Sequence, residues 1–366
     1  MLLKHNILME PTLTSTDVKA KAGSIKCVVW DLDNTVWNGV LLEDKQVTIR
    51  PEVVACMKEL DRRGILQSIA SKNNYKDAWE KLTHFELSYL FLYPQIGWHN
   101  KSISIKNIQE KLNIGMDAIA FIDDQPFERE EVQHQHPDVV CYPDTVTGNM
   151  LEMKEFMPRF VTPESAMRRS MYQSDAQRND IEENYESNHA FLESLNLKFS
   201  IQRATVDDLQ RVEELTVRTN QLNATGYTYS YDELEQFLDS PNHQIYVASL
   251  EDKYGTYGKI GVAMVEANND VWSLKLLLMS CRVMSRGVGG VLLGYLIKQA
   301  RAQQKVLQGT FFPTDRNRLM YMTYKFSGFQ EFEKRDDGGV IFRHPLTEDP
   351  VFPAYIELIT PEGRIQ

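Results

Sequence analysis

Cys27-Val28-Val29-Trp30-Asp31-Leu32-Asp33-Asn34-Thr35 is the stretch that decides the fold of the first half of this sequence. An unbroken apolar run such as Cys27 to Trp30 is typical of a strand buried on both faces of a parallel sheet. Asp31 and Asp33 follow directly, so both carboxylates stand at the carboxyl end of the strand, where open α/β sheets bind their ligands. Two acids at such an end can share a divalent cation while one of them attacks phosphorus.

Polar groups also follow the other strands expected in this half. Ser71 comes directly after the second apolar run, where a hydroxyl can bond a phosphoryl oxygen, although a structural serine in a loop is about as common. Lys101 opens an amphipathic helix at an end that favours anions, which indicates a lysine that meets a phosphate or a carboxylate rather than solvent. Asp123 and Asp124 follow a further apolar run and would repel each other unless a cation held them.

The composition restricts the class of protein. With 366 residues, of which 42% are apolar, the chain is long enough for two domains that each bury a core. The formal net charge of −11 argues against a nucleic-acid surface, which needs a basic footprint. The cysteines show neither CxxC nor metal-ligand spacing, and the sequence has no long apolar run or signal-peptide pattern. We therefore expect a cytoplasmic protein with free thiols that binds neither nucleic acid nor membrane.

The second half, from Leu197, places strands and helices in a different order. One strand and two helices come first, then three strands, a long helix, and a further strand, helix and strand. Its most informative motif is Arg286-Gly287-Val288-Gly289-Gly290, which opens the long helix. Glycines let backbone amides approach a pyrophosphate, and the helix N-terminus favours its negative charge. Close packing of the helix is the alternative explanation of these glycines.

Asp31-Leu32-Asp33-Asn34-Thr35 resembles the first motif, DxDx(T/V), of the haloacid dehalogenase-like phosphotransferases. The resemblance implies that Asp31 is the nucleophile, that Asp33 is the general acid/base, and that Mg²⁺ bridges the site. Ser71, Lys101 and the pair Asp123-Asp124 match the later motifs of the family. It thus implies catalysis by Asp31, Asp33, Ser71 and Lys101, with Asp31, the Asp33 carbonyl, Asp123 and Asp124 around the metal.

The fold class that follows is α/β, with an N-terminal Rossmann-like parallel sheet of haloacid dehalogenase type and a C-terminal GNAT-like α/β domain. Segment 36–47 predicts a small hairpin flap over the acids, with Asn38-Gly39 at its turn. Segment 89–93 predicts a further strand of the first sheet. A cap as small as this flap leaves the site open to a bulky substrate, including a carrier-bound one.

The order of elements from Leu197 resembles the GNAT acyltransferase fold, in which an (R/Q)xxGx(G/A) loop holds the pyrophosphate of coenzyme A. Arg286 and Gly289 match this loop, but Val291 stands where a small residue is expected. We therefore expect the loop to hold the phosphate of a carrier's phosphopantetheine rather than free coenzyme A. Together with a later motif of the fold, the resemblance implies cofactor-arm binding by Arg286, Gly287, Gly289, Gly290, Asn317 and Tyr324.

A haloacid dehalogenase-like half followed by a GNAT-like half resembles the FkbH-like family of polyketide assembly over nearly the whole chain. The stretches that carry this resemblance are Trp30 to Trp37, Phe121 to Pro126, Arg218 to Asn223 and Ser280 to Gly287. The resemblance implies capture of a glyceryl unit from 1,3-bisphosphoglycerate, dephosphorylation, and delivery to the phosphopantetheine thiol of an acyl carrier protein. It also implies substrate binding by Arg218, Asn220, Gln221 and Asn223.

Cys281 is the expected nucleophile of the second half. In GNAT folds the acyl thioester and its acceptor meet where the fourth and fifth strands separate, and Cys281 follows the fourth. A thiol close to Arg282, Arg286 and a helix N-terminus should have a lowered pKa and attack an acyl group. A small buried hydrophobe is the alternative for a single cysteine, and it is our interpretation of the other three.

Changes of composition divide the chain into five segments. These are a flexible lead-in (1–24), a phosphatase-like domain (25–160), a helical linker (161–196), an acyltransferase-like domain (197–345) and a C-terminal extension (346–366). The linker is polar and contains Arg168 and Arg169, which either dock an acidic partner or lie on a solvated helix face.

Several functions remain open on the sequence. The favoured one is a bifunctional enzyme that forms an acyl thioester on Cys281 and removes phosphate at Asp31. A second is a Mg²⁺-dependent phosphatase whose GNAT-like half only binds a partner, and a third is an N-acyltransferase with an inactive phosphatase half. The intact acidic motifs and Val291 weigh against the third. A non-catalytic assembly scaffold is a distant fourth.

Overall fold

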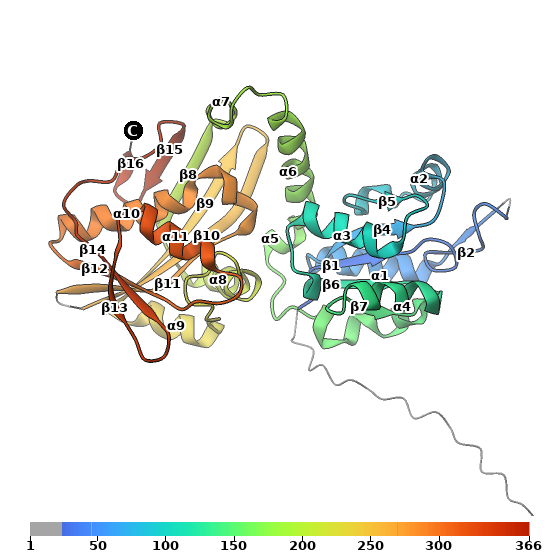
Figure 1. The fold of residues 1–366 in the computed structure, drawn as a ribbon, viewed down its shortest axis with the longest axis horizontal. Helices are drawn as coiled ribbons and strands as arrows, with labels where there is room; N and C mark the ends of the chain where they lie inside the picture. The colour runs from blue at the N-terminus through green and yellow to red at the C-terminus, as the bar shows by residue number, and fades with distance from the viewer. Residues whose placement is uncertain (1–23, 45, 269, 366) are drawn as a thin grey trace, which may run out of the picture.

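A computed structural model describes residues 24–365 apart from 45 and 269, and within them the chain forms two α/β units joined by a helical segment (Figure 1). The lead-in therefore lies almost entirely outside the described residues. The N-terminal unit lies on one side of the helical segment and the C-terminal unit on the other.

The sheet of the N-terminal unit has the strand order β5-β4-β1-β6-β7, and every neighbouring pair is parallel. Its strands are β1 (Cys27–Trp30), β4 (Leu66–Ser71), β5 (Gln95–Ile96), β6 (Ile119–Ile122) and β7 (Val140–Tyr142). All four residues of β1 are buried because helices cover both faces of the sheet. This arrangement confirms the predicted Rossmann-like sheet of haloacid dehalogenase type.

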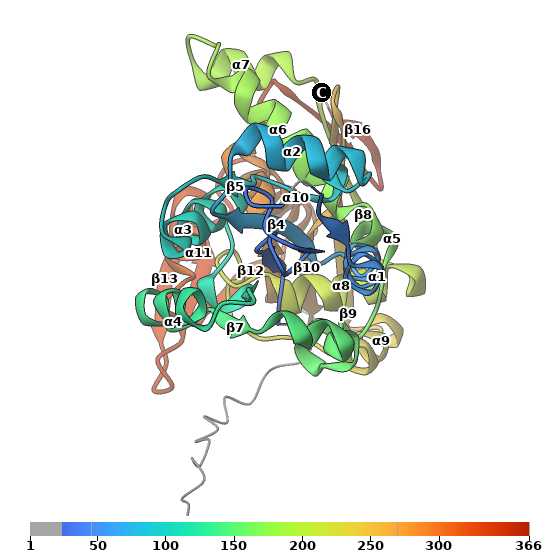
Figure 2. The same cartoon turned by 90° about the vertical axis from the view of Figure 1, so that its right-hand side faces the viewer.

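The helices of this unit fall on opposite faces of the sheet, as Figure 2 shows. They are α1 (Pro51–Arg62), α2 (Tyr75–His84), α3 (Lys101–Leu112) and α4 (Pro126–Gln135). The apolar stripe of α1 packs with Val28 and Trp30 on one face, whereas that of α3 packs with Cys27 and Val29 on the other. Short 3₁₀ turns cover the rest, namely η1 (Ser88–Leu90), η2 (Met116–Ala118), η3 (Asp144–Gly148), η4 (Met150–Glu152) and η5 (Lys154–Phe156).

Two local predictions for this unit need correction. The flap exists as β2 (Trp37–Asn38) paired with β3 (Thr48–Ile49), but Asn38 pairs with Thr48, so the connection is a long loop and not an Asn-Gly turn. Segment 89–93, predicted as a strand, contains most of η1 and only an isolated bridge from Phe91 to Gln67. The edge strand is β5, two residues further on.

The helical segment ties the two units together. It consists of α5 (Pro163–Ala166), α6 (Arg168–Glu182) and α7 (Asn188–Ser194). Arg169 pairs with Asp61 of the N-terminal unit at 2.9 Å, whereas the buried Arg178 pairs with Asp252 of the C-terminal unit at 2.7 Å. The arginines of α6 therefore bind carboxylates of this chain, so Arg169 does not lie on a solvated helix face.

The sheet of the C-terminal unit has the order β13-β14-β12-β11-β10-β9-β8-β15-β16. Its strands are β8 (Leu197–Arg203), β9 (His243–Asp252), β10 (Gly255–Ala267), β11 (Val271–Met279), β12 (Val306–Phe311), β13 (Gln330–Lys334), β14 (Val340–His344), β15 (Ile356–Thr360) and β16 (Gly363–Ile365). The segment set apart as a C-terminal extension thus supplies β15 and β16, and β15 runs parallel to β8.

Helices cover both faces of this second sheet. The helices α8 (Val206–Arg218) and α9 (Tyr231–Asp239) pack on one face, and α10 (Val288–Ala302) and α11 (Arg318–Phe326) pack on the other. β11 pairs with β12 only from Val271 to Leu274 and then continues to Met279 without that partner. The two strands therefore separate towards the 3₁₀ turn η6 (Cys281–Arg286), as in the predicted GNAT-like domain. Within the described residues, no helix combines the length and apolar character needed to cross a membrane.

Candidate active sites

Three carboxylates meet at the carboxyl edge of the first sheet. Asp31 follows β1, and Asp123 and Asp124 follow the neighbouring parallel strand β6, so both strands deliver their acids to the same edge. One oxygen of each carboxylate lies within 4.8 Å of the others. Asp31 and Asp123 are buried, whereas Asp124 is half-buried. The sequence thus located a compact acidic trio correctly in space.

Lys101 provides the positive charge that faces this trio. It is the first residue of α3, and its ammonium group forms a short ion pair with Asp31 and lies 3.2 Å from Asp123 Oδ2. It also donates to the carbonyl oxygen of Ala70, at 2.7 Å. Lys101 is 3% exposed, so the expected contact with a carboxylate is seen and the solvent alternative is excluded.

The pKa shifts at this site indicate that the positive charge of Lys101 does not compensate the negative charges of the three carboxylates. Burial raises the pKa of Asp31, and the attraction of Lys101 offsets this only in part. Burial and the charge of Asp31 raise the pKa of Asp123 to about 7 and also raise that of Asp124. Burial alone would lower the pKa of Lys101, but Asp31 and Asp123 raise it. The trio therefore has a deficit of positive charge.

The residues at this edge fit a divalent cation. Asp124 Oδ1 is buried and accepts no hydrogen bond from any residue that the structure describes, and Asp123 Oδ2, also buried, is contacted by the Lys101 ammonium at 3.2 Å. Carboxylate oxygens are the ligands that Mg²⁺ prefers, and a bound cation would satisfy the unpartnered Asp124 Oδ1. Asp31, Asp123 and Asp124 would hold the ion.

Asp33 is held apart from the trio. Its carboxylate accepts hydrogen bonds from the flap, from Trp37 Nε1 at 2.8 Å and the backbone N–H of Leu41 at 3.1 Å, and from Asn73 Nδ2 at 2.9 Å. The Asp33 carboxylate therefore does not belong to the group that would hold the metal ion. Metal binding through the Asp33 carbonyl stays a prediction. The flap instead orients this carboxylate beside the site.

Ser71 and Asn73 complete this edge of the sheet. Ser71 ends β4 and is buried, and its hydroxyl accepts a long hydrogen bond from Asn73 Nδ2, at 3.4 Å. Asn73 Oδ1 is buried and accepts no hydrogen bond within the described part of the chain, so it can meet a substrate hydroxyl. Sequence reasoning missed Asn73, although its position two residues beyond a strand end was the available signal.

Cys281 begins η6 at the junction of the two units. It is half-buried and lines two adjoining cavities of ≈ 70 Å³ and ≈ 480 Å³. The smaller cavity is also lined by Lys26, which directly precedes β1 of the N-terminal unit. Sequence reasoning missed Lys26 because nothing in the local pattern connects it with a cysteine far along the chain.

The electrostatics of Cys281 differ from the prediction. Burial raises the pKa of its thiol, and Lys26, the backbone amides of Cys281 and Gln221, and Arg282 offset this only in part. The predicted lowering of the pKa is therefore wrong, because neighbouring cations do not outweigh the loss of water around the sulfur.

The backbone of the glycine-rich loop is accessible to a ligand, whereas the side chain of Arg286 is buried. Added Cβ atoms at Gly289 and Gly290 would meet no heavy atom within 4 Å, so ligands can approach this backbone, whereas Gly287 is required by its φ of 73°. Arg286 is buried against the Phe191 ring and pairs with Glu182 of α6 at 3.2 Å. Arg286, expected to hold a phosphate, thus pairs with α6, and it also lines the ≈ 480 Å³ cavity next to Cys281.

Two further residues expected at the cofactor arm are structural. Asn317 is fully buried, and its amide donates to the carbonyl oxygens of Asn223 and Phe312 at 3.0 and 2.8 Å. Tyr324 is fully buried against Phe342, and its hydroxyl lies so close to Gly309 that an added Cβ there would be 2.6 Å away. Both side chains stabilise the region around β12 and do not line the loop.

The four residues expected to bind substrate do not all lie at one site. Arg218 lines the small cavity beside Cys281, whereas the side chain of Asn223 organises a turn by accepting from the backbone N–H groups of Thr225 and Gly226. Asn220 is exposed, and Gln221 contributes its backbone amide to Cys281. The structure therefore brings Arg218 and the Gln221 backbone to the cysteine, and it does not bring the Asn223 side chain there.

An apolar cavity of ≈ 440 Å³ lies beside the glycine-rich loop. It is bounded by the end of β11, by η6, by the start of α10 and by α11. Its lining includes Leu222, Met279, Met284, Gly289, Leu319 and Phe326. Met284 also lines the ≈ 480 Å³ cavity next to Cys281, so the two cavities meet at this side chain.

No protein-family model matches this chain, and no curated protein matches it either. Among solved structures, the N-terminal part of the protein BF1531 from Bacteroides fragilis, which contains a phosphatase domain in complex with Mg, is 32% identical. The match covers 38% of this chain and 41% of that chain, with a TM-score of 0.32. This chain thus spans less than half of that Bacteroides protein.

Other solved structures are similar to a comparable share of this chain. The ribosomal-protein-S18-alanine N-acetyltransferase from Escherichia coli is 15% identical, with 41% of this chain and 95% of that chain covered and a TM-score of 0.33. The GNAT domain of PAT from S. lividans is 17% identical, with 39% and 88% covered and a TM-score of 0.31.

Proposed function

We propose that this chain is a bifunctional enzyme that captures a glyceryl unit from 1,3-bisphosphoglycerate on Cys281, removes a phosphate at Asp31, and passes the acyl group to the phosphopantetheine thiol of an acyl carrier protein. The observation that supports this proposal is the presence in one chain of a buried carboxylate trio beside Lys101 and of a cysteine in a cation-lined cavity. The first arrangement suits phosphoryl transfer, and the second suits attack on a phosphorylated acyl donor.

At the first site, Asp31 is the attacking group. A bond forms between its carboxylate oxygen and phosphorus while the bond from phosphorus to the substrate oxygen breaks, and that oxygen takes a proton from Asp33. Water then displaces the phosphate from Asp31 and gives its proton back to Asp33. Lys101 holds Asp31 in orientation throughout. Bound Mg²⁺ would supply positive charge that offsets the phosphate and the acids.

At the second site, Cys281 sulfur bonds to the acyl carbon of the acyl phosphate. The carbon–oxygen bond to phosphate breaks, and the departing phosphate takes the electron pair and the thiol proton, which gives a thioester and hydrogen phosphate. The carrier thiol then attacks this thioester, and its proton passes to the Cys281 sulfur as that sulfur departs. The backbone amide of Gln221, which favours negative charge on the sulfur, also supports both steps.

The ≈ 440 Å³ apolar cavity is suited to the carrier's arm. Its floor is the strand β11, its end is the open glycine loop, and it reaches Met284, which borders the cavity of Cys281. A phosphate at the glycine loop would meet backbone amides at the start of α10. A flexible arm lying in this cavity would thus bring its thiol towards Cys281.

One face of α11 forms the rim of the same cavity and suits an acidic carrier. The face consists of Arg318, Leu319, Met322, Lys325 and Phe326. Phe326 is 83% and Leu319 44% exposed, and Arg318 and Lys325 are exposed cations that pair with no carboxylate in the described part of the chain. The helix itself carries no acid, although the chain as a whole has a net charge of −11. Acidic side chains on a partner would complement this face.

Charge reversal on this face should weaken delivery to the carrier. The double variant Arg318→Glu and Lys325→Glu is expected to lower the rate of acyl transfer to the carrier by about one order of magnitude at low salt, because both charges lie at the rim. Loading of Cys281 and phosphate release should be unchanged. Lys58→Glu, an exposed helix lysine of the N-terminal unit, is the matched control. Unaltered transfer by the double variant would show that the carrier docks elsewhere.

The proposed function is tested directly with wild-type protein. In the presence of 1,3-bisphosphoglycerate, Mg²⁺ and a phosphopantetheinylated carrier protein, we expect intact-protein mass spectrometry to show glyceryl on the carrier. With EDTA, the carrier should instead receive phosphoglyceryl, because the acidic trio lacks its cation. Phosphate release without any protein acylation would favour the partner-binding phosphatase, and transfer from acetyl coenzyme A to an amine would favour the N-acyltransferase.

A further inference from the structure

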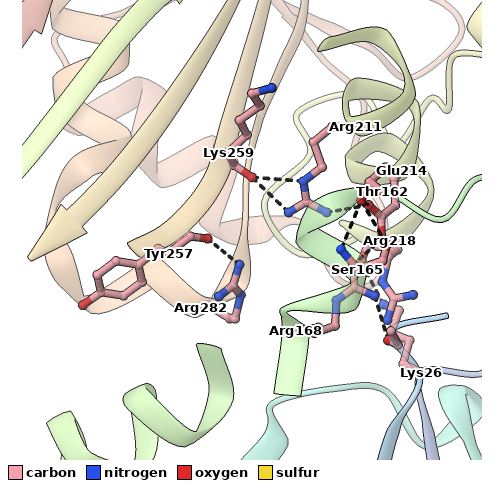
Figure 3. A network of polar contacts seen from close by, with 11 residues as sticks. Lys26, Thr162, Ser165, Arg168, Arg211, Glu214, Arg218, Tyr257, Lys259 and Arg282 are labelled. Atoms are coloured by element: carbon pink, nitrogen blue, oxygen red, sulfur yellow. Dashed lines mark hydrogen bonds and ion pairs between the residues drawn. The ribbon is translucent and has the colours of Figure 1, made fainter. Parts of the chain in front are cut away.

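The small cavity beside Cys281 is built by both units of the chain. The N-terminal unit contributes Lys26, the helical segment contributes Arg168, and the C-terminal unit contributes Arg211, Arg218 and Arg282, as Figure 3 shows for the network around it. Its volume of ≈ 70 Å³ is several times the space that one water molecule needs, so a tetrahedral anion fits.

The charges around this cavity do not cancel. Glu214 is the carboxylate that its cations share, and it forms a short ion pair with Arg168 and a 2.7 Å contact with Arg211. Lys26, Arg218 and Arg282 form no ion pair with any residue that the structure describes. Lys26 donates only to a carbonyl oxygen, that of Arg218, at 2.8 Å. Uncompensated cations in a buried space call for an anion.

Donor groups on two of these cations are still available. Arg282 gives one hydrogen bond through Nη2, to the carbonyl oxygen of Tyr257 at 2.8 Å, whereas its Nη1 is buried and has no partner among the described residues. The guanidinium of Arg218 likewise donates to none of the described residues. Burial and the charges of neighbouring arginines lower the pKa of Lys26 to about 8 and that of Arg218 to about 9. A bound anion would relieve both effects.

We propose that this cavity binds a phosphate group next to Cys281, with Lys26, Arg218 and Arg282 as its ligands. The proposal rests on the proposed function in that the phosphate is the one attached to the acyl group that Cys281 attacks. Lys26 then links the units, because a residue of the phosphatase half completes the acyl-transfer site. The same cations would favour the departing phosphate as the carbon–oxygen bond breaks.

The test measures how anions protect Cys281 from iodoacetamide, read at the Cys281 peptide by mass spectrometry, so it requires no turnover. At about ten times its dissociation constant, inorganic phosphate is expected to slow alkylation about tenfold. The compound 3-phosphoglycerate should protect similarly, whereas glycerate and chloride at matched ionic strength should not. No protection by phosphate, or equal protection by chloride, would overturn the proposal.

Substitutions identify the ligands. Lys26→Met and Arg218→Met should each abolish protection by phosphate, whereas Lys26→Arg and Arg218→Lys should retain most of it. Lys198→Met, at an exposed lysine on β8, is the matched control and should behave as wild type. Full protection in both methionine variants would show that phosphate binds elsewhere. If phosphate protects the wild-type protein but Cys281 never acquires an acyl group, the proposed function would be refuted. The phosphate site proposed here would still be supported.

Discussion

Replacing Asp31 by Asn is expected to lower the rate of phosphate release by at least about three orders of magnitude while leaving the fold intact. The amide cannot attack phosphorus, and the trio loses one of the charges that would hold the cation. Lys101 keeps Asp123, 3.2 Å away, so the buried ammonium group is not left without a carboxylate. Released phosphate is measured with 1,3-bisphosphoglycerate and Mg²⁺, and folding is followed by thermal unfolding.

The matched control is Asp144→Asn. Asp144 belongs to the same unit but pairs with Arg50 at 2.8 Å, outside the trio, so this variant should keep its phosphatase activity. A second readout is independent of turnover, since Mg²⁺ should raise the unfolding temperature of the wild type and of Asp144→Asn but not that of Asp31→Asn. An Asp31→Asn protein that still releases phosphate at the wild-type rate would refute the assignment of the nucleophile.

The first site could be predicted from sequence because the carboxyl ends of all strands in a parallel sheet lie on the same side. Each buried strand shows an apolar run, and the residue after the run must emerge at the carboxyl edge, whatever the intervening helices do. Asp31, Ser71 and Asp123 therefore converge although they are far apart in sequence. Lys101 was predictable for a different reason, since a cation at a helix start is unfavourable unless a negative group lies close to it.

The second site depends on contacts between distant segments, which leave no local pattern. Arg286 pairs with Glu182 of the linker helix, and Lys26 reaches Cys281 across the junction of the units. The pKa of Cys281 is raised because burial at that junction outweighs the positive charges that lie near it in sequence. The pairing of β15 with β8, at the far end of the chain, was hidden for the same reason.

The two sites lie at opposite ends of the strands of the N-terminal sheet. The cavity of Cys281 is at the amino ends, and the Asp31 site is at the carboxyl ends. Lys26, at the cavity of Cys281, precedes β1, and Asp31 follows it, so the four residues of this extended strand separate them by about 16 Å. In Figure 1 the flap strand β2 lies at the end of the N-terminal unit that faces away from the C-terminal unit. A phosphoglyceryl group on Cys281 is too short to span this distance. In this arrangement the phosphate on Cys281 cannot reach Asp31 of its own chain.

We therefore expect the Asp31 site of a second molecule to remove the phosphate from acylated Cys281. An acyl phosphate is an activated donor, whereas a phosphate monoester is among the slowest groups to hydrolyse, so capture should come first. With 1,3-bisphosphoglycerate, Asp31→Asn should accumulate phosphoglyceryl on Cys281, and Cys281→Ala should acquire no adduct. Both outcomes are read by intact-protein mass spectrometry.

The decisive experiment mixes the two variants after free substrate has been removed. Loaded Asp31→Asn protein should keep its phosphate when alone and lose it when Cys281→Ala protein is added, at a rate that rises with the concentration of the latter. The double variant Cys281→Ala and Asp31→Asn is the matched control and should have no effect, because it carries no nucleophile at the phosphatase site. Persistence of phosphoglyceryl at every concentration, together with concentration-independent dephosphorylation in the wild type, would show instead that one chain brings its two sheet edges together by a rearrangement of its units.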